Sequence, residues 1–334
     1  MRFGLRLWVS LLLVAAAVAP GLAPSAAAAG AAPTVSVLYA GSLAALNDQR
    51  LGPAFTRLTG IGYSGHGGGS LALAQEIAGG ELTGDVFESV GTAALARVGS
   101  RRLPWAVAVA SQPLVVAYNP HGRYAADFAA IARGRRPLRD LFSLLATPGL
   151  RLGRTDPAAD PQGQAFVLMV RLATRLYRLP ADTPTRILGG LENPAQLFEE
   201  TALPAELQAG ALDAASAFLP QALALHLPYV ALPPSLDFAA SGDARLYGEV
   251  SLRLPDGQVV RGAPLAVWAG PLEGPGSHTS LGVDYVRFLL SARGQALWRK
   301  AGYTPVAPQV YGHRALVPPG VAREIAALTR SRHG

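Results

Sequence analysis

The alternation of short strands with helical patterns near the start of the chain restricts its fold most strongly. Residues 34–40 alternate valine with polar residues, and shorter strand patterns follow at residues 61–63 and 85–89. Between them, apolar residues recur at helical spacing over residues 43–59, where Gly52-Pro53 interrupts the period, and over residues 71–78. This β-α-β-α-β order predicts an α/β fold with a parallel sheet and helices on its faces.

The rest of the chain predicts a second body of structure. A length of 334 residues, at about 150 residues per domain, predicts two domains. An extended apolar run at residues 105–118 precedes three helical patterns, and Asp256-Gly257 between short β patterns predicts a hairpin. The expected helices are residues 124–133, 137–146, 161–179 and, near the end of the chain, 281–303.

The composition excludes several classes of chemistry. The chain has no cysteine, which excludes disulfides, thiolate metal sites, a cysteine nucleophile and a lipoprotein anchor. Its six histidines are scattered singly, and no serine-hydrolase, zinc-protease or phosphate-loop motif is present. Asp156 and Asp160 would be the acid/base pair of an enzyme, but both stand beside prolines in a helix-capping context. We therefore expect neither catalysis nor a cofactor, and no metal site.

The positive charge is too diffuse to indicate a nucleic-acid surface. The formal net charge is +7. Two of the positive charges, Arg2 and Arg6, belong to the amino-terminal leader. The densest basic cluster, residues 133–139, is short and has no interleaved aromatic side chains. A solvated helix end explains this cluster, so no nucleic-acid partner is expected.

The first 29 residues have the order of a secretory signal peptide. Arg2 and Arg6 precede an apolar stretch at residues 7–19, and a small-residue zone ends at residue 29. The alternative is an uncleaved anchor that carries a sensory ectodomain, although Pro20, Gly21 and Pro24 disfavour one continuous helix. The pattern predicts a periplasmic or secreted protein with a cleaved leader.

Small polar residues stand where helices should begin after strands. Ser42 follows Gly41, Ser70 follows a run of glycines, and Asp160 begins an Asp-Pro-Gln-Gly turn. A helix start offers free backbone N–H groups and a positive dipole end, so a hydroxyl and nearby glycines can make an oxyanion cradle. Simple N-capping by each serine is the alternative. Two serines at carboxyl ends of parallel strands would lie at the edge where open α/β sheets bind ligands.

These residues resemble a known family. Residues 37–43 (Val-Leu-Tyr-Ala-Gly-Ser-Leu), Gly68-Gly69-Ser70 and residues 84–89 look like the molybdate and tungstate receptors of ABC transporters. The resemblance continues in order through residues 153–163, 210–213, 227–233 and 288–303, and so covers nearly the whole chain after the leader.

The resemblance implies a two-lobed periplasmic binding protein fold of the second type, with a ligand cleft between the lobes. Lobe 1 would comprise residues 34–115 and 262–334, and lobe 2 residues 116–261, with crossings near residues 112–119 and 262–269. It also implies a monomeric receptor that captures molybdate or tungstate and passes it to a membrane permease. Sulfate, thiosulfate or another oxyanion is the alternative ligand.

The resemblance also assigns binding roles to individual residues of this sequence. Ser42 and Ser70 match the family's hydroxyl donors, and Gln162 matches the backbone donor from the second lobe. Phe218 stands where the family has a tyrosine hydroxyl, and we expect it to offer an apolar wall. Some archaeal relatives place two carboxylates on the metal, but no acid lies between Ser216 and Pro220. We therefore expect Asp160 to cap its helix beside a tetrahedral, hydrogen-bonded anion.

Overall fold

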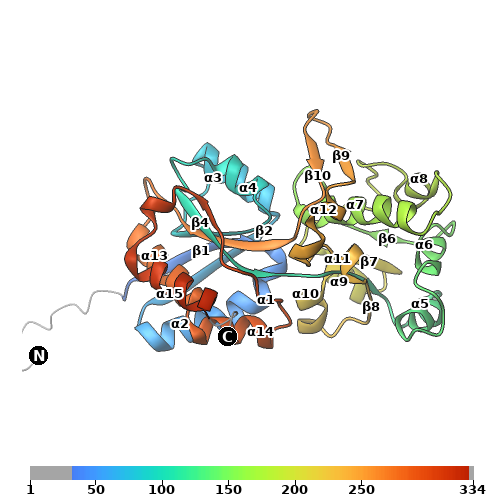
Figure 1. Cartoon of the computed structure of the whole chain (residues 1–334). Helices are drawn as coiled ribbons and strands as arrows, with labels where there is room; N and C mark the ends of the chain where they lie inside the picture. The colour runs from blue at the N-terminus through green and yellow to red at the C-terminus, as the bar shows by residue number, and fades with distance from the viewer. Residues whose placement is uncertain (1–31, 331–334) are drawn as a thin grey trace, which may run out of the picture. The chain divides into compact units, whose positions relative to one another are not determined.

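The computed structural model describes residues 32–330 and contains two main sheets (Figure 1). The first sheet has the strand order β12-β4-β11-β3-β1-β2. β1 pairs in parallel with β2 and β3, as predicted, but β11 and β12 run antiparallel to their neighbours. β11 enters the sheet directly from the other half of the chain, without the crossover helix that a parallel neighbour needs. The strands are β1 (Thr34–Ala40), β2 (Gly62–Gly68), β3 (Val86–Val90), β4 (Trp105–Ser111), β11 (Ala266–Pro271) and β12 (Val310–Gly312).

Helices cover both faces of the first sheet because successive side chains of each strand point to opposite faces. Leu38 packs with α3 (Ser70–Gly79) and α4 (Ala93–Val98). Val37 and Tyr39 instead pack in the larger core with α2 (Gly52–Thr59) and α13 (Thr279–Leu290). α14 (Ala292–Lys300) and α15 (Pro319–Arg330) lie on the side of α13 (Figure 1).

The second sheet has the order β6-β7-β5-β8 and is also covered on both faces. Its strands are β5 (Leu114–Tyr118), β6 (Leu152–Gly153), β7 (Ala214–Phe218) and β8 (Tyr229–Ala231). The predicted hairpin is present as β9 (Ser251–Arg253) and β10 (Val259–Arg261). The helices of this half are α5 (Ala125–Ala132), α6 (Asp140–Leu145), α7 (Pro161–Leu176), α8 (Thr183–Leu188), α9 (Leu203–Gln208), α10 (Leu219–Ala224), α11 (Pro234–Asp237) and α12 (Ala244–Tyr247).

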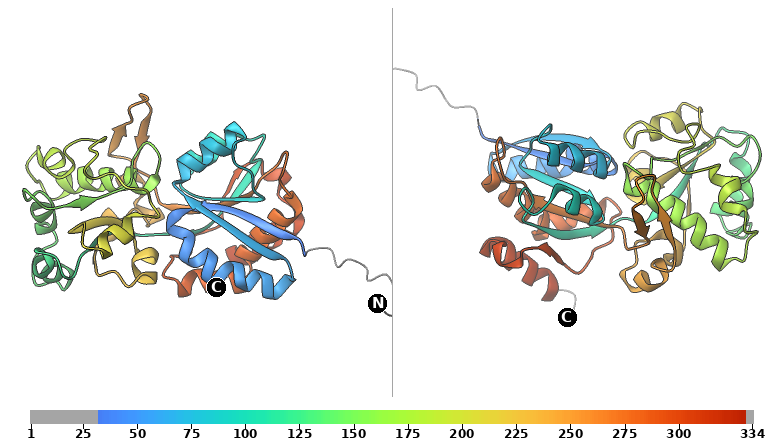
Figure 2. Two further views of the ribbon diagram at one scale, coloured as in Figure 1. Left: turned by 180° about the vertical axis from the view of Figure 1, so that it is seen from behind. Right: turned by 90° about the horizontal axis from the view of Figure 1, so that it is seen from above.

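Two short segments carry the chain between the sheets (Figure 2). The outward segment lies between Ser111, the last residue of β4, and Leu114, the first residue of β5. The return lies between Arg261, the last residue of β10, and Ala266, the first residue of β11. The amino-terminal and carboxyl-terminal parts of the described chain thus build the first sheet together.

The glycine-rich residues 65–68 are part of strand β2, although the sequence predicted a strand only at residues 61–63. β2 continues to Gly68 because it pairs with β1 along its whole length. A Cβ atom at Gly65 or Gly67 would lie 2.7 or 2.8 Å from the ring of Tyr39. These glycines let the strand pass close to the tyrosine ring, so their role here is close packing.

Two helices differ from their predicted forms. The helix over residues 41–59 does not break at Gly52-Pro53, because a π-helical turn at residues 47–51 leads directly into α2 and Pro53 lies in its first turn. The predicted helix 281–303 is two helices, α13 and α14. Ser291 separates them, since its hydroxyl oxygen accepts a hydrogen bond of 3.2 Å from the N–H of Gly294 and caps α14.

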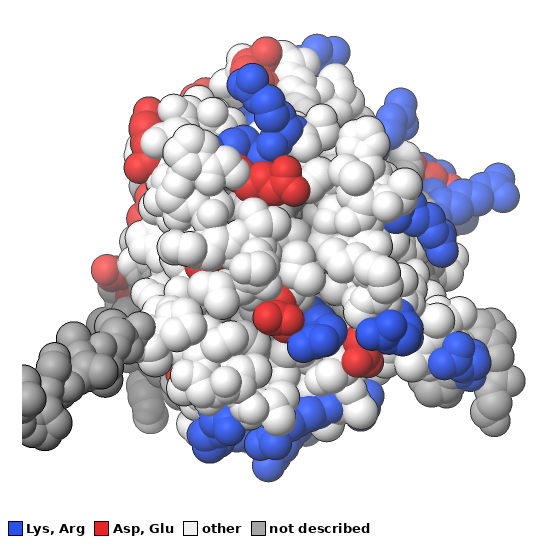
Figure 3. Space-filling view, turned by 90° about the vertical axis from the view of Figure 1, so that its left-hand side faces the viewer, with Lys and Arg blue, Asp and Glu red and all other residues white. Residues whose placement is uncertain are grey.

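The described residues contain no helix long and apolar enough to cross a membrane. The predicted leader, residues 1–29, lies outside the described residues. On the face shown in Figure 3, acidic side chains lie among the basic ones, in keeping with a diffuse positive charge.

Candidate functional site

Ser42 and Ser70 follow the carboxyl ends of the adjacent parallel strands β1 and β2. Both are buried, with 3% and 0% exposure. Neither serine side chain caps a helix, because the N-cap positions are Ala40 and Gly69. The oxygen of Ser42 instead accepts a hydrogen bond of 3.4 Å from the side chain of Gln112. The oxygen of Ser70 accepts a hydrogen bond of 3.3 Å from the N–H of Val90. The N-capping alternative is therefore wrong for both serines.

Asp160 is the N-cap of α7, as predicted. Its Oδ1 accepts hydrogen bonds from the N–H of Gln162 at 2.7 Å and the hydroxyl of Thr155 at 3.0 Å. Its Oδ2 points toward Gly69 of the first half, where a Cβ atom would lie only 3.3 Å away. The cap therefore orients one carboxylate oxygen and leaves the other facing the start of α3.

The start of α3 already has an acceptor from the other half of the chain. The carbonyl oxygen of Ala159 accepts hydrogen bonds from the N–H groups of Leu71 at 3.1 Å and Ala72 at 3.2 Å. These N–H groups are the donors that the sequence suggested for an anion. A ligand oxygen at this helix terminus would have to replace the Ala159 carbonyl.

Glu200 completes the cluster and was not predicted from the sequence. It precedes α9 and is 3% exposed, and the nearby hydroxyl and N–H of Ser42 favour the ionised form of its carboxyl group. Its carboxyl group also interacts directly with that of Asp160. No spacing or motif distinguishes Glu200 from its exposed neighbour Glu199, so only the fold reveals it.

Arg154 holds in place the loop that leads to Glu200. Its guanidinium donates to the Gln196 side chain at 3.1 Å and to the carbonyl oxygens of Gly190 and Leu191 at 2.6 and 2.8 Å. Its backbone also donates to the Gln196 carbonyl and accepts from the N–H of Phe198. The buried arginine therefore holds residues 190–198 against the end of β6.

Burial raises the pKa of both carboxyl groups, Asp160 and Glu200. The charge of Asp160 raises the pKa of Glu200 further, whereas hydrogen bonds from Gln162 and Thr155 favour ionised Asp160. The pair therefore retains a proton, held on Glu200 and donated to Asp160. This proton also satisfies Asp160 Oδ2 and Glu200 Oε2, which no donor among the described residues reaches.

Gln162 extends the cluster to the second sheet. Its Oε1 accepts a hydrogen bond of 2.9 Å from the hydroxyl of Ser216, and its buried Nε2 has no acceptor among the described residues. Buried Gln112 Oε1 likewise has no donor there. Phe218, at the end of β7, is fully buried in the main core. The structure thus links Ser42, Asp160 and Gln162 and places Ser70 beside them, while the expected role of Phe218 as a wall stays a prediction.

This cluster can recognise a ligand by hydrogen bonds and shape. It offers hydroxyl and amide groups and a proton-sharing carboxyl pair, all buried in low-dielectric surroundings. The described residues contain no group of three or more histidine, cysteine or acidic side chains placed to hold a metal ion.

Comparison with known proteins identifies the family. The profile of the bacterial extracellular solute-binding proteins matches residues 35–304. The chain belongs to this family. The family is non-enzymatic, which confirms the expectation that the chain carries no catalytic activity.

Individual relatives agree with this assignment. A Haloferax volcanii protein, named as a candidate ABC transporter molybdenum-binding protein, is 34% identical over 70% of this chain and 71% of its own length. The molybdate/tungstate-binding protein WtpA of Pyrococcus abyssi is 23% identical over 58% of this chain and 60% of its own. The periplasmic molybdate-binding protein of Azotobacter vinelandii superposes with a TM-score of 0.57 at 16% identity, covering 81% of this chain and 99% of its own. This superposition confirms the predicted fold, a two-sheet periplasmic binding protein.

The shared proton predicts how the stability of the ligand-free protein depends on pH. The folded protein keeps a proton that the unfolded chain releases near pH 4.3, so this pair lowers the free energy of unfolding as pH rises above about 4. Glu200→Gln keeps a donor toward Asp160 and removes the titration. Urea denaturation should show the variant gaining stability relative to wild type between pH 5 and pH 8.

The matched control is Glu199→Gln, which changes the exposed neighbour and should leave the pH dependence as in wild type. Equal pH dependence for Glu200→Gln and wild type would show that Glu200 is ionised in the folded protein.

Proposed function

We propose that the protein captures a tetrahedral oxyanion, molybdate or tungstate, outside the cytoplasm and delivers it to the permease of an ABC transporter. The observation that carries the proposal is the buried meeting of hydroxyl, amide and carboxyl groups from both sheets at the strand ends. Buried Gln162 Nε2 is a donor with no acceptor among the described residues, as expected of a group that binds an oxyanion. The names of the Haloferax and Pyrococcus relatives support molybdenum or tungsten as the central atom.

The protonation of the carboxyl pair favours hydrogen bonding to the anion over bonds to its metal. The proton shared by the two carboxyl groups leaves the pair with one negative charge instead of two, which reduces its repulsion of a dianion. The Oδ1 of Asp160 is already occupied by two donors from its own half of the chain. Glu200 therefore supplies a second carboxyl group without changing the expected four-coordinate anion.

Ligand binding would bring two lobes together. The first comprises residues 34–115 and 262–334, and the second comprises residues 116–261. Ser42 and Ser70 belong to the first and Asp160, Gln162 and Glu200 to the second, so an anion between them contacts both at once. An anion that binds only when both sets are close stabilises the closed arrangement. Opening would break the hydrogen bonds from Leu71 and Ala72 to the Ala159 carbonyl and admit the ligand.

Removal of either serine hydroxyl should weaken oxyanion binding. Each hydroxyl that donates to a buried anion is worth about 1.5–3 kcal/mol, or roughly tenfold or more in affinity. Ser42→Ala and Ser70→Ala should therefore raise the dissociation constant for molybdate in calorimetric titration and lower the melting temperature only slightly. The control Ser143→Ala removes an exposed hydroxyl from α6 and should bind as wild type.

A panel of molybdate, tungstate, sulfate, thiosulfate and phosphate identifies the preferred anion. Wild-type affinity in both serine variants would refute the site, and binding of none of these anions would refute the function.

Solution scattering should detect closure. The radius of gyration of the protein should be smaller with saturating molybdate than without it, because the bound anion stabilises the closed arrangement. Chloride at the same ionic strength is the control. Identical curves in both conditions would exclude closure of the two lobes by ligand.

X-ray absorption spectroscopy should determine the coordination of the bound metal. A hydrogen-bonded tungstate keeps four oxygen neighbours, and the spectrum of the complex should match free tungstate in both wild type and Asp160→Asn. A six-coordinate spectrum that Asp160→Asn or Glu200→Gln abolishes would show that carboxylates bind the metal.

A further inference from the structure

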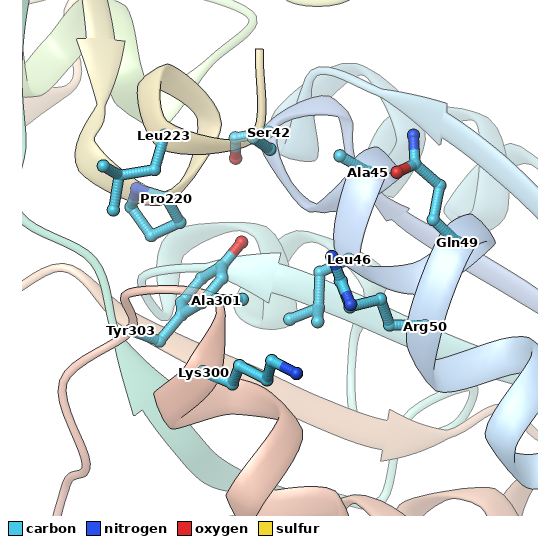
Figure 4. Close-up of a pocket in the computed structure, with 11 residues that line it drawn as sticks. Ser42, Ala45, Leu46, Gln49, Arg50, Pro220, Leu223, Lys300, Ala301 and Tyr303 are labelled. Atoms are coloured by element: carbon cyan, nitrogen blue, oxygen red, sulfur yellow. The ribbon is translucent and has the colours of Figure 1, made fainter. Parts of the chain in front are cut away.

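A second polar cavity lies on the solvent side of Ser42 (Figure 4). Its volume is about 160 Å³, enough for a small oxyanion with part of its hydration shell. Ser42, Arg50, Lys300 and Tyr303 bring the polar groups to its wall, and residues of α10 close the side toward the second sheet. Ser42 therefore belongs both to the buried cluster and to this more open cavity.

The two spaces differ in charge. The wall of the cavity carries two basic side chains and no acidic one. The buried cluster carries two carboxyl groups, Asp160 and Glu200, and no basic one among its contacts described above. A dianion near the cluster thus finds its favourable charge only in the outer cavity.

The basic side chains of the cavity are free to face a ligand. Arg50 and Lys300 are exposed, and neither has an ion pair or hydrogen bond with another described residue. In Figure 4 they extend from opposite walls toward the same space beside Leu46. Lys300 is the only lysine in the chain. Two unpaired cations that point into one cavity create a positive potential that attracts anions.

Tyr303 connects the cavity to the cluster. Its ring is 4% exposed, and in Figure 4 its hydroxyl points toward the side of the cavity where Ser42 lies. Burial raises the pKa of Tyr303 well above its usual value, so the hydroxyl remains a donor. A tyrosine hydroxyl is thus available near Ser42 although position 218 holds phenylalanine.

From these observations we infer that the cavity of Arg50, Lys300, Tyr303 and Ser42 is a capture site, where a small oxyanion dianion binds first before it moves to the buried cluster. This inference rests on the proposed function, since it assumes an anionic ligand. Arg50 and Lys300 raise the rate at which the anion encounters the protein. The hydroxyl groups of Tyr303 and Ser42 then donate hydrogen bonds to the anion as it loses its hydration shell. The buried cluster then holds the anion through its hydroxyl and amide donors.

A capture site should affect the association rate of the anion and leave its dissociation rate nearly unchanged. Charges that attract a ligand before it reaches its final site act mainly on the association rate and its salt dependence. Rapid filtration with radiolabelled molybdate measures both rates directly. For Arg50→Gln and Lys300→Gln, and more strongly for the double variant, we expect the association rate to fall by about three- to tenfold at low salt. The dissociation rate should stay within about twofold of wild type.

The matched control is Arg57→Gln, which removes the same charge from an exposed position on α2 outside the cavity wall. It should leave both rates unchanged. The wild-type association rate should also fall steeply as ionic strength rises, and the double variant should lose most of this dependence.

Two outcomes would overturn the capture site. One is an association rate that is the same in wild type and the double variant, and the other is a loss of affinity that lies entirely in faster dissociation. Either result leaves the proposed function intact, because wild type still binds molybdate. Failure of wild type to bind any oxyanion would instead refute the proposed function itself.

Discussion

The contact of Glu200 with Asp160 and Ser42 is the interaction on which the rest of the site depends. Glu200 reaches Ser42 of the first half and Asp160 of its own half, both within the protein interior. Two buried carboxyl groups in contact are unfavourable unless a proton is shared and donors surround them. The hydroxyl and N–H of Ser42, the N–H of Gln162 and the hydroxyl of Thr155 provide those donors. The serine at the end of β1 therefore stabilises both the carboxyl pair and the junction of the two halves.

Residues outside this contact hold its two carboxyl groups in position. Arg154 is buried and holds the loop that precedes Glu200 through hydrogen bonds to carbonyl and amide oxygens. Gly163 lets α7 begin close to Thr155, since a Cβ atom there would lie 2.3 Å from the Thr155 carbonyl oxygen. Together these features bring Asp160 and Glu200, which are far apart in the sequence, to one point. Glycine and arginine act here as positioning residues, with no expected contact to a ligand.

The sequence predicted the local features well. Period-two alternation identified β1, the Asp-Gly pair identified the β9–β10 hairpin, and the Asp-Pro pair identified the start of α7. It failed where tertiary packing or a local cap overrides the pattern. Pairing with β1 extends β2 through the glycine-rich residues to Gly68, and Ser291 divides the last long helix. Glu200 was missed because it lies in a loop, where burial against Ser42 and Asp160 leaves no periodic signal in the sequence. Ser42 and Ser70 were proposed as site residues because they follow the ends of strands, and their role in binding stays a prediction.

The arrangement suggests that cations at the entrance attract the anion and that hydroxyl and amide donors inside bind it. The proposed position of the bound anion is among Ser42, Ser70, Asp160, Gln162 and Glu200. Anomalous diffraction at a tungsten absorption edge, from crystals grown with tungstate, tests this claim most directly. The account predicts a single strong tungsten peak with its oxygen atoms in hydrogen-bonding reach of the Ser42 and Ser70 hydroxyl groups. A fully occupied tungsten peak elsewhere, with this cluster empty, would contradict it.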